Sequence, residues 1–314
     1  MSLEEKKIRV INKEEKEYPR RLKEIPKPPE KLYILGSLPV ERIPSVAVIG
    51  ARDCSEYGRY VAARLGSVLG RKGIQVISGM ARGIDGIAQE AAVDAGGYSY
   101  AVLGSGVDVC YPASNKSLYE KLKVTGGILS EYPPGTSAIA RNFPARNRIV
   151  SGLADAIIVV EAREKSGTLI TVDMALEQGR EVYAVPGRIT DSLSVGCNRL
   201  LKLGAGILLD TDEFLEELKG ITAKRCMAWE DRELRENTSE VFRENDRKEA
   251  KLPEGEPELL AIYHALDFSP AGPEQIRERL PEKYQGTPIP LLLIRLCMEN
   301  LAVQVSPGQF CRKE

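Results

Sequence analysis

The sequence of 314 residues is poor in histidine, tryptophan and paired cysteine. It has one histidine, His264, and six cysteines with no CxxC spacing among them. A zinc site, a disulfide framework and a Ser-His-Asp hydrolase therefore find little support. No apolar run approaches the roughly 18 residues of a membrane-spanning helix, and residues 1–7 lack the apolar stretch of a signal peptide. We expect a cytoplasmic protein with no metal, no membrane partner and no catalytic residues.

An excess of charge of one sign is also missing, since 44 basic and 45 acidic residues give a net charge of −1. This balance neither demands nor excludes a polyanionic partner, so any basic surface has to be local. Hydrophobic residues at 43% and charged residues at 28% exclude collagen-like and wholly disordered chains. The length suits one large domain and one small one.

The middle of the chain alternates short apolar runs with helical stretches. The runs are Val46–Ile49, Ile74–Ile77, Tyr98–Leu103, Ile128–Ser130, Ala156–Val160, Val182–Val185 and Ile207–Leu209. Their alternation with helices predicts a parallel, doubly wound α/β sheet over residues 45–220. Residues 1–44 are polar and rich in proline, and they are expected to form an N-terminal arm with one edge strand at Leu32–Gly36.

The last third of the chain changes character at residue 221. Residues 221–251 carry 16 charged residues of mixed sign, which predicts a flexible or loosely helical linker. Residues 252–314 regain an apolar pattern, with three helix candidates and two strands: Pro257–Leu266, Pro273–Leu280, Ile289–Asn300, Ala302–Ser306 and Gln309–Arg312. Three helices followed by a hairpin indicate a small winged-helix-like domain, and an unspecialised helical domain fits the pattern equally well.

Three glycine-rich turns follow strands of the predicted sheet: Gly50–Asp53, Ser78–Asp85 and Ser166–Thr168. Ligands of open parallel sheets bind at the carboxyl ends of the strands, where these turns should converge. Each turn offers backbone N–H groups and a helix N-terminus, which suits an anion such as phosphate. Any one turn taken alone is explained equally well by a tight bend and a helix cap.

Nucleotide-binding fingerprints are absent when they are tested letter by letter. No G-x-x-x-x-G-K-[ST] occurs, and the nearest dinucleotide candidate, Gly104–Val109, has valine where the third glycine is needed. We therefore expect no nicotinamide cofactor, no hydrolysis at a P-loop and no other cofactor.

The segment Arg141–Arg148 has three arginines, two amides and an aromatic, without an acid. Arginine pairs bidentately with phosphate, and the face of Phe143 can stack on a base. These properties suit a groove for single-stranded nucleic acid, which Arg163 and Lys165 would extend. The alternative is a solvated, basic helix start with Phe143 tucked into the core.

The motifs in their order along the chain resemble those of the DNA-processing protein A (DprA/Smf) family. They are Gly50–Arg52, Ser78–Asp85, Leu103–Gly106, Tyr111-Pro112, Phe143–Leu153, Val159–Ala162, Ser166–Thr171 and Ala184–Gly187. The resemblance spans about Tyr18 to Asp210. It implies an extended Rossmann-like fold that binds and protects single-stranded DNA and helps to load the RecA recombinase in natural transformation.

Carried over position by position, the resemblance names sixteen candidate DNA-contacting residues. They are Gly50, Arg52, Ser78, Gly79, Met80, Ala81, Arg82, Gly83, Phe143, Arg146, Asn147, Arg148, Lys165, Ser166, Gly167 and Thr168. The expected partners are single-stranded DNA, RecA and a second copy of the chain in a homodimer.

Two other functions compete with DNA binding at the sheet. Related Rossmann enzymes, the nucleotide phosphoribohydrolases, carry P-G-G-x-G-T-x-x-E, but this chain has Arg163–Lys165 in place of the first three letters and Thr171 in place of the acid. A duplex-DNA regulator would read bases with Ile289–Asn300, which is apolar nearly all round. We therefore expect a binding protein without chemistry.

Overall fold

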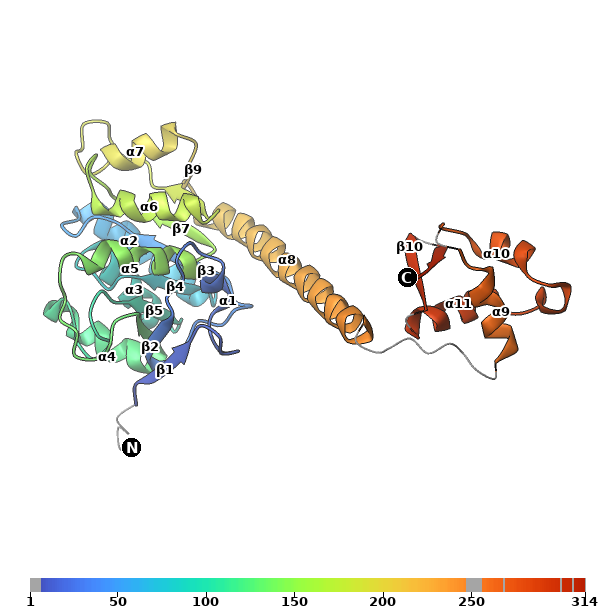
Figure 1. Ribbon diagram of the computed structural model, residues 1–314. Helices are drawn as coiled ribbons and strands as arrows, with labels where there is room; N and C mark the ends of the chain where they lie inside the picture. The colour runs from blue at the N-terminus through green and yellow to red at the C-terminus, as the bar shows by residue number, and fades with distance from the viewer. Residues whose placement is uncertain (1–6, 247–255, 268, 300, 307, 314) are drawn as a thin grey trace. The chain divides into compact units, whose positions relative to one another are not determined.

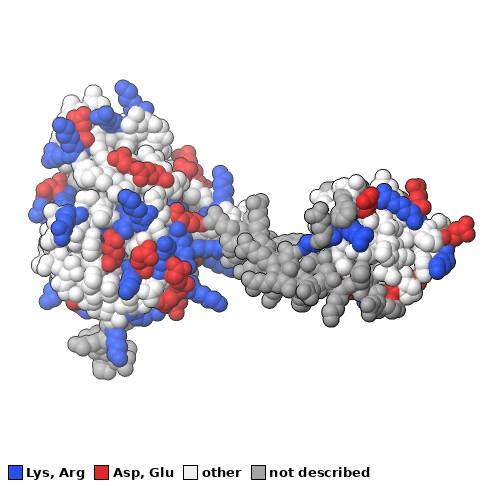
Figure 2. Space-filling view, in the orientation of Figure 1, with Lys and Arg blue, Asp and Glu red and all other residues white. Residues whose placement is uncertain are grey.

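The computed structural model describes residues 7–246, 256–267, 269–299, 301–306 and 308–313 (Figure 1). The chain divides into two compact units, Met1–Cys226 and Met227–Glu314. Lys, Arg, Asp and Glu are interspersed over the face of the first unit that Figure 2 shows, as expected from a net charge of −1. No helix in the described part of the chain is both long enough and apolar enough to cross a membrane.

The first unit is built on a nine-stranded sheet with the order β1-β2-β6-β5-β4-β3-β7-β8-β9. Its strands are β1 (Arg9–Asn12), β2 (Lys31–Gly36), β3 (Ser45–Ile49), β4 (Gln75–Ser78), β5 (Ser99–Val102), β6 (Gly126–Ser130), β7 (Ala156–Val159), β8 (Glu181–Ala184) and β9 (Gly206–Ile207). Strands β3 to β9 pair in parallel, whereas β1 with β2 and β2 with β6 are antiparallel. The expected doubly wound α/β fold is confirmed.

Helices cover both faces of this sheet (Figure 1). They are α1 (Arg20–Lys23), α2 (Glu56–Arg71), α3 (Ile84–Asp94), α4 (Lys116–Thr125), α5 (Asn142–Leu153), α6 (Gly167–Glu177) and α7 (Val195–Lys202), with a 3₁₀ turn η1 (Ala113–Asn115). Of the long helix α8 (Thr211–Asp246), the first turns pack on the sheet through Phe214, Leu215 and Leu218. Side chains of β3 alternate between the faces: Ala47 and Ile49 pack with α5 and α6, whereas Val46 and Val48 pack with α2 and α3. Because successive strand residues point to opposite faces, such runs bury two cores at once.

The N-terminal segment is more than the expected arm. Tyr18, Leu22 and Ile34 are buried in the core of the first unit. The strand expected at the edge, now β2, is covered by β1, so β1 is the edge strand on that side. Strand β1 was not predicted, because a four-residue antiparallel strand needs no apolar alternation of its own when its partner is buried.

A buried ionic cluster ties the N-terminal segment to the start of α8. The Asp155 carboxylate, only 1% exposed, pairs with Arg225 of α8 and lies 3.7 Å from Nη1 of Arg21. Arg21 also donates to the carbonyl oxygen of Leu153 at 2.8 Å, and its Nε lies 3.3 Å from Glu41. Burial lowers the pKa of Arg21 to about 10, so the guanidinium is still charged at neutral pH.

The predicted linker is helical as far as it is described, since α8 runs to Asp246 and residues 247–251 lie outside the described part. Glu, Lys, Arg and Ala have high helix propensity, which a search for apolar periodicity does not register.

The second unit contains helices and strands close to the expected positions. They are α9 (Pro257–Ala265), α10 (Pro273–Arg279), η2 (Glu282–Tyr284), α11 (Ile289–Met298), β10 (Ala302–Ser306) and β11 (Gln309–Arg312). Leu259, Ile276 and Leu293 belong to one core cluster, which brings the three helices together. Asn300 and Pro307, which the sequence placed at a helix end and in the hairpin turn, lie outside the described residues.

Candidate nucleic-acid interface

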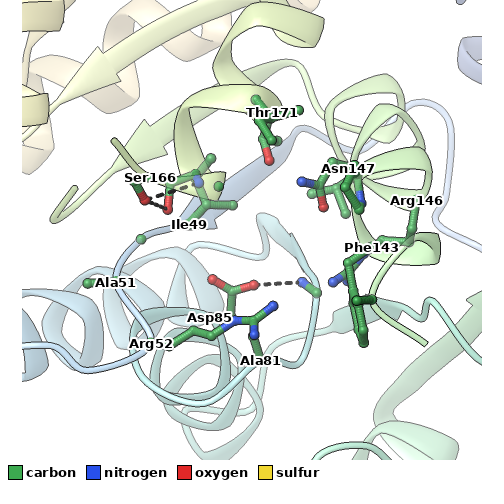
Figure 3. Close-up of a pocket in the computed structure, with 18 of the residues that line it drawn as sticks. Ile49, Ala51, Arg52, Ala81, Asp85, Phe143, Arg146, Asn147, Ser166 and Thr171 are labelled. Carbon is green, nitrogen blue, oxygen red and sulfur yellow. Dashed lines mark hydrogen bonds between the residues drawn. The ribbon is translucent and has the colours of Figure 1, made fainter. Parts of the chain in front are cut away.

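The strand order of the sheet reverses between β3 and β7, because the chain winds from β3 toward β6 on one side and from β7 toward β9 on the other. A cavity of about 520 Å³, which we call the first cavity, lies at the carboxyl ends of these strands (Figure 3). Its lining includes Gly50 after β3, Gly79 after β4 and Ser166 after β7. This is the position where open α/β sheets bind ligands.

The turn before α6 presents an open helix N-terminus to the first cavity. The Ser166 hydroxyl caps the helix by accepting from the Thr168 N–H at 3.2 Å. Apart from the turn and the helix backbone themselves, no atom of the described residues lies within 4 Å of the place where a Cβ of Gly167 would stand, so the backbone there is open to a ligand. The N–H groups and the dipole of the first turn favour an anion.

The loop after β4 fits the cavity floor only because of its glycines. Gly79 rests on the guanidinium of Arg146, where any Cβ would overlap it. Gly83 has φ +81°, a left-handed conformation, and a Cβ would meet the carbonyl oxygen of Arg52 at 2.5 Å. The Asn115 side chain fixes the loop by donating to the carbonyl oxygen of Met80 at 3.0 Å.

The floor of the first cavity holds opposite charges, Asp85 and Arg146. The Asp85 carboxylate accepts from the Gly79 N–H at 3.1 Å (Figure 3). Burial raises the pKa of Asp85, and the Arg146 charge and the N–H groups of Gly79 and Gly50 oppose this rise. Arg146 donates to the carbonyl oxygen of Val102, and burial lowers its pKa to about 10. Arg146 is therefore buried near an acid, whereas Arg52 is exposed at the rim of the cavity.

Aromatic and cationic side chains meet on the α5 side of the first cavity. Phe143 is half-buried, and its ring centroid lies 5.5 Å from that of the exposed Tyr111. Arg52 stands over the Phe143 ring at 5.6 Å and Arg146 at 5.8 Å. On the same helix Asn147 also lines the cavity.

The first cavity therefore combines an aromatic face, an exposed guanidinium, an amide and the N-terminus of α6. An aromatic face stacks on a base of any identity, and the guanidinium and backbone N–H groups bind phosphate. The arrangement suits a nucleotide unit of a single strand, whose bases are free to stack on protein side chains.

The structure brings many of the expected contact residues together in the first cavity. Those in its lining are Gly50, Arg52, Gly79, Ala81, Phe143, Arg146, Asn147, Ser166, Gly167 and Thr168. Arg82 and Gly83 line a neighbouring cavity instead, and Lys165 is exposed outside both linings.

Three expected contact residues point elsewhere. The Ser78 hydroxyl donates to the carbonyl oxygen of Val48, and the Met80 side chain is fully buried in a core cluster. Arg148 makes two hydrogen bonds of 2.7 Å to the Glu131 carboxylate. All three residues lie close in sequence to residues that line the cavity. Their actual hydrogen-bond and packing partners come from distant parts of the chain, so the sequence alone does not reveal them.

Sequence reasoning did not select several cavity residues. Tyr111 lies in the family motif Tyr111-Pro112 but is not among the candidate contact residues. An aromatic residue that follows a glycine-rich turn was a usable signal for it. Asp85 lies in the Ser78–Asp85 turn, which the sequence predicts at the ligand-binding edge, but its place near Arg146 at the cavity floor depends on the fold. Ala138, Ala140 and Ile170 also line the cavity, and nothing in their local sequence marks them.

The similarity to known proteins covers the part of the chain that contains the first cavity. Residues 9–219 match a family model described as DNA recombination-mediator protein A. The chain is 42% identical over 202 residues to DNA processing protein DprA of Streptococcus pneumoniae, covering 64% of this chain and 71% of that protein. It is 35% identical over 313 residues to protein Smf of Escherichia coli, covering 99% of this chain and 79% of that protein.

Solved structures agree with these sequence matches. The X-ray structure of DNA processing protein A from S. pneumoniae superposes with a TM-score of 0.64 at 40% identity, over 67% of this chain and 74% of that one. DNA processing protein A from Helicobacter pylori, solved to explain its single-stranded DNA binding mode, gives a TM-score of 0.62 at 29% identity, over 68% of this chain and 96% of that one.

Proposed function

The chain belongs to the DNA recombination-mediator protein A family, and from that premise we propose that it binds single-stranded DNA and acts in DNA processing and recombination in the cytoplasm. The membership confirms the resemblance found in the motifs. The observation that carries the proposal is the first cavity, where the Phe143 ring and the Arg52 guanidinium face the open N-terminus of α6. A stacked base and its phosphate would occupy this space.

Arg52 is the residue for which charge neutralisation can be tested most directly, because it is exposed and lies at the cavity rim. Replacement of Arg52 by Ala should flatten the log–log salt dependence of single-strand affinity by about 0.7, the value for one released counterion. Arg71→Ala is the matched control, since Arg71 ends α2 at the opposite edge of the sheet. A gel-shift titration over several salt concentrations measures both slopes. An Arg52→Ala slope equal to that of the wild type would contradict phosphate contact.

In this proposal the protein binds single-stranded DNA without catalysing a reaction. The one carboxylate among the residues of the first cavity, Asp85, accepts from the Gly79 N–H and lies within the electrostatic influence of Arg146, and Thr171 occupies the place of the acid in phosphoribohydrolases. Incubation with nucleoside monophosphates should release no free base above that of a buffer blank. Turnover that disappears in Asp85→Asn would establish the enzymatic alternative.

The second unit is proposed to be a winged-helix-like module that does not read duplex DNA. Leu291, Ile294 and Met298 are exposed on α11, where a recognition helix would carry polar side chains. Arg295 on that helix is already paired, at 2.6 Å with Glu256 and at 2.9 Å with Glu299.

Two protein partners are proposed from family membership: the RecA recombinase, which the protein would help to load on protected single strands, and a second copy of the chain in a homodimer. We also retain residues 45–220 as the DNA-binding domain, with residues 1–44, 221–251 and 252–314 as the other parts of the chain. Single-stranded DNA would bind within residues 45–220, because every residue of the first cavity lies there.

A further inference from the structure

A second cavity, of about 540 Å³, lies beside the first. It is lined by Arg52, Arg59, Arg82, Asp53 and Glu90 among others. Arg52 belongs to the lining of both cavities, so a ligand that leaves the first cavity past this side chain enters the second. The family motifs accounted for Arg52 and Arg82 but assigned nothing to Arg59.

Two arginines of the second cavity, Arg82 and Arg59, form exposed ion pairs with acidic neighbours. Arg82 pairs with Asp53, and the two side chains are 64% and 78% exposed. Arg59 lies 3.6 Å from Glu56 on its own helix, with exposures of 55% and 92%. Exposed pairs of this kind contribute little stability, so a phosphate can replace the carboxylate at small cost.

Other charges at the second cavity favour an anion. Glu90, the remaining acid of the lining, is already paired with Lys121 at 3.1 Å. Helices α3 and α4 begin at this cavity with Gly83 and Asn115 as their N-caps, and neither helix start has a side-chain cap. The N–H groups of Ile84 and Gly86 in the first turn of α3 already donate to the carbonyl oxygens of Ala51 and Ala81, so the arginines supply most of the positive potential.

Two exposed tyrosines stand on α2, the helix whose Arg59 lines the second cavity. Tyr57 is 53% exposed and Tyr60 is 63% exposed, and neither belongs to the lining of that cavity. Residues three apart lie on the same face of a helix, so the two rings share one face of α2, and Arg59 lies on another. Exposed aromatic side chains of this kind can stack on unstacked bases.

We propose that the second cavity and the Tyr57–Tyr60 face continue the path of the single strand, with Arg59 and Arg82 binding phosphates and the two tyrosines stacking on the bases that follow. The inference rests on the proposed function, because the strand reaches this surface from the first cavity past Arg52. The ligand class is an extended single strand, since a duplex keeps its bases stacked and hidden from the tyrosine rings.

Oligonucleotides of increasing length test this path. Wild-type affinity for oligothymidylates should rise from a length that fills only the first cavity to a length that fills both. The double variant Tyr57→Leu with Tyr60→Leu should bind the long oligomer about tenfold or more weakly, which is the loss expected for one stacked base. Its affinity for the short oligomer should fall much less. Arg59→Ala should flatten the salt dependence of the long oligomer by about 0.7. Arg71→Ala, on the same helix at its other end, is the matched control.

The outcomes separate this inference from the proposed function. Selective weakening of the long oligomer supports the path. Equal affinity of wild type and both variants for the long oligomer overturns the path while leaving the proposed function standing. Weakening of both lengths by the same factor also overturns it, because the effect would then arise in the first cavity. Failure of the wild type to bind any single strand contradicts the proposed function itself. A melting scan of each variant shows that the exposed substitutions leave the fold intact.

Discussion

Replacement of Asp155 by Asn should lower the free energy of unfolding by about 3–5 kcal/mol, which is the usual loss when one partner of a buried ion pair is removed. The Asp155 side chain is 1% exposed and forms ion pairs with both Arg21 and Arg225. An asparagine can still accept from the Ser45 N–H, now at 2.9 Å, so the change removes charge more than shape. Two buried guanidinium groups would lose the carboxylate that both contact, and the half-buried Glu41 would still lie 3.3 Å from Arg21.

Urea denaturation followed by circular dichroism measures this loss as a shift of the midpoint at constant m-value. Asp173→Asn is the matched control, because Asp173 is exposed on α6, and surface changes of this kind usually stay within about 0.5 kcal/mol. A midpoint for Asp155→Asn equal to that of the control would mean that the cluster does not hold α8 and the N-terminal segment in place.

Phe143→Ala should weaken single-strand binding by roughly 1–3 kcal/mol at every salt concentration, because it removes a stacking surface and no charge. The salt slope should therefore stay at its wild-type value, in contrast to Arg52→Ala. The ring is half-buried and belongs to none of the hydrophobic core clusters in the described residues, so the melting temperature should change little.

Phe214→Ala is the matched control for this substitution. Phe214 is 3% exposed, and its ring meets that of Tyr183 edge-on with the centroids 4.9 Å apart. The same loss of a ring at this position should cost about 3–5 kcal/mol of stability. A melting scan beside the binding assay separates the two roles, and a collapse of the Phe143→Ala melting temperature to that of Phe214→Ala would show that Phe143 is a core residue.

The contact roles expected for the arginines of α5 illustrate how far the sequence can be trusted at the site. Arg146 and Arg148 both looked free to bind phosphate, because no acid lies near them in the chain. The fold places Asp85 beside Arg146 and Glu131 beside Arg148. Arg52, which stays exposed at the rim, is left as the stronger candidate for phosphate contact.

Apolar runs and glycine turns are enough to predict the parallel strands of the sheet and the edge of it that carries the site. Fully buried parallel strands require continuous apolar runs, and the turns that leave them need glycine for close backbone approach, so both features are local and readable. Which side chains face a ligand depends on contacts that form only in the folded chain. The burial of Met80, the position of Asp85 near Arg146 and the sharing of Arg52 by two cavities all depend on contacts between segments distant in the chain. Charge and exposure are properties of such contacts, and a residue's own neighbours in sequence do not fix them.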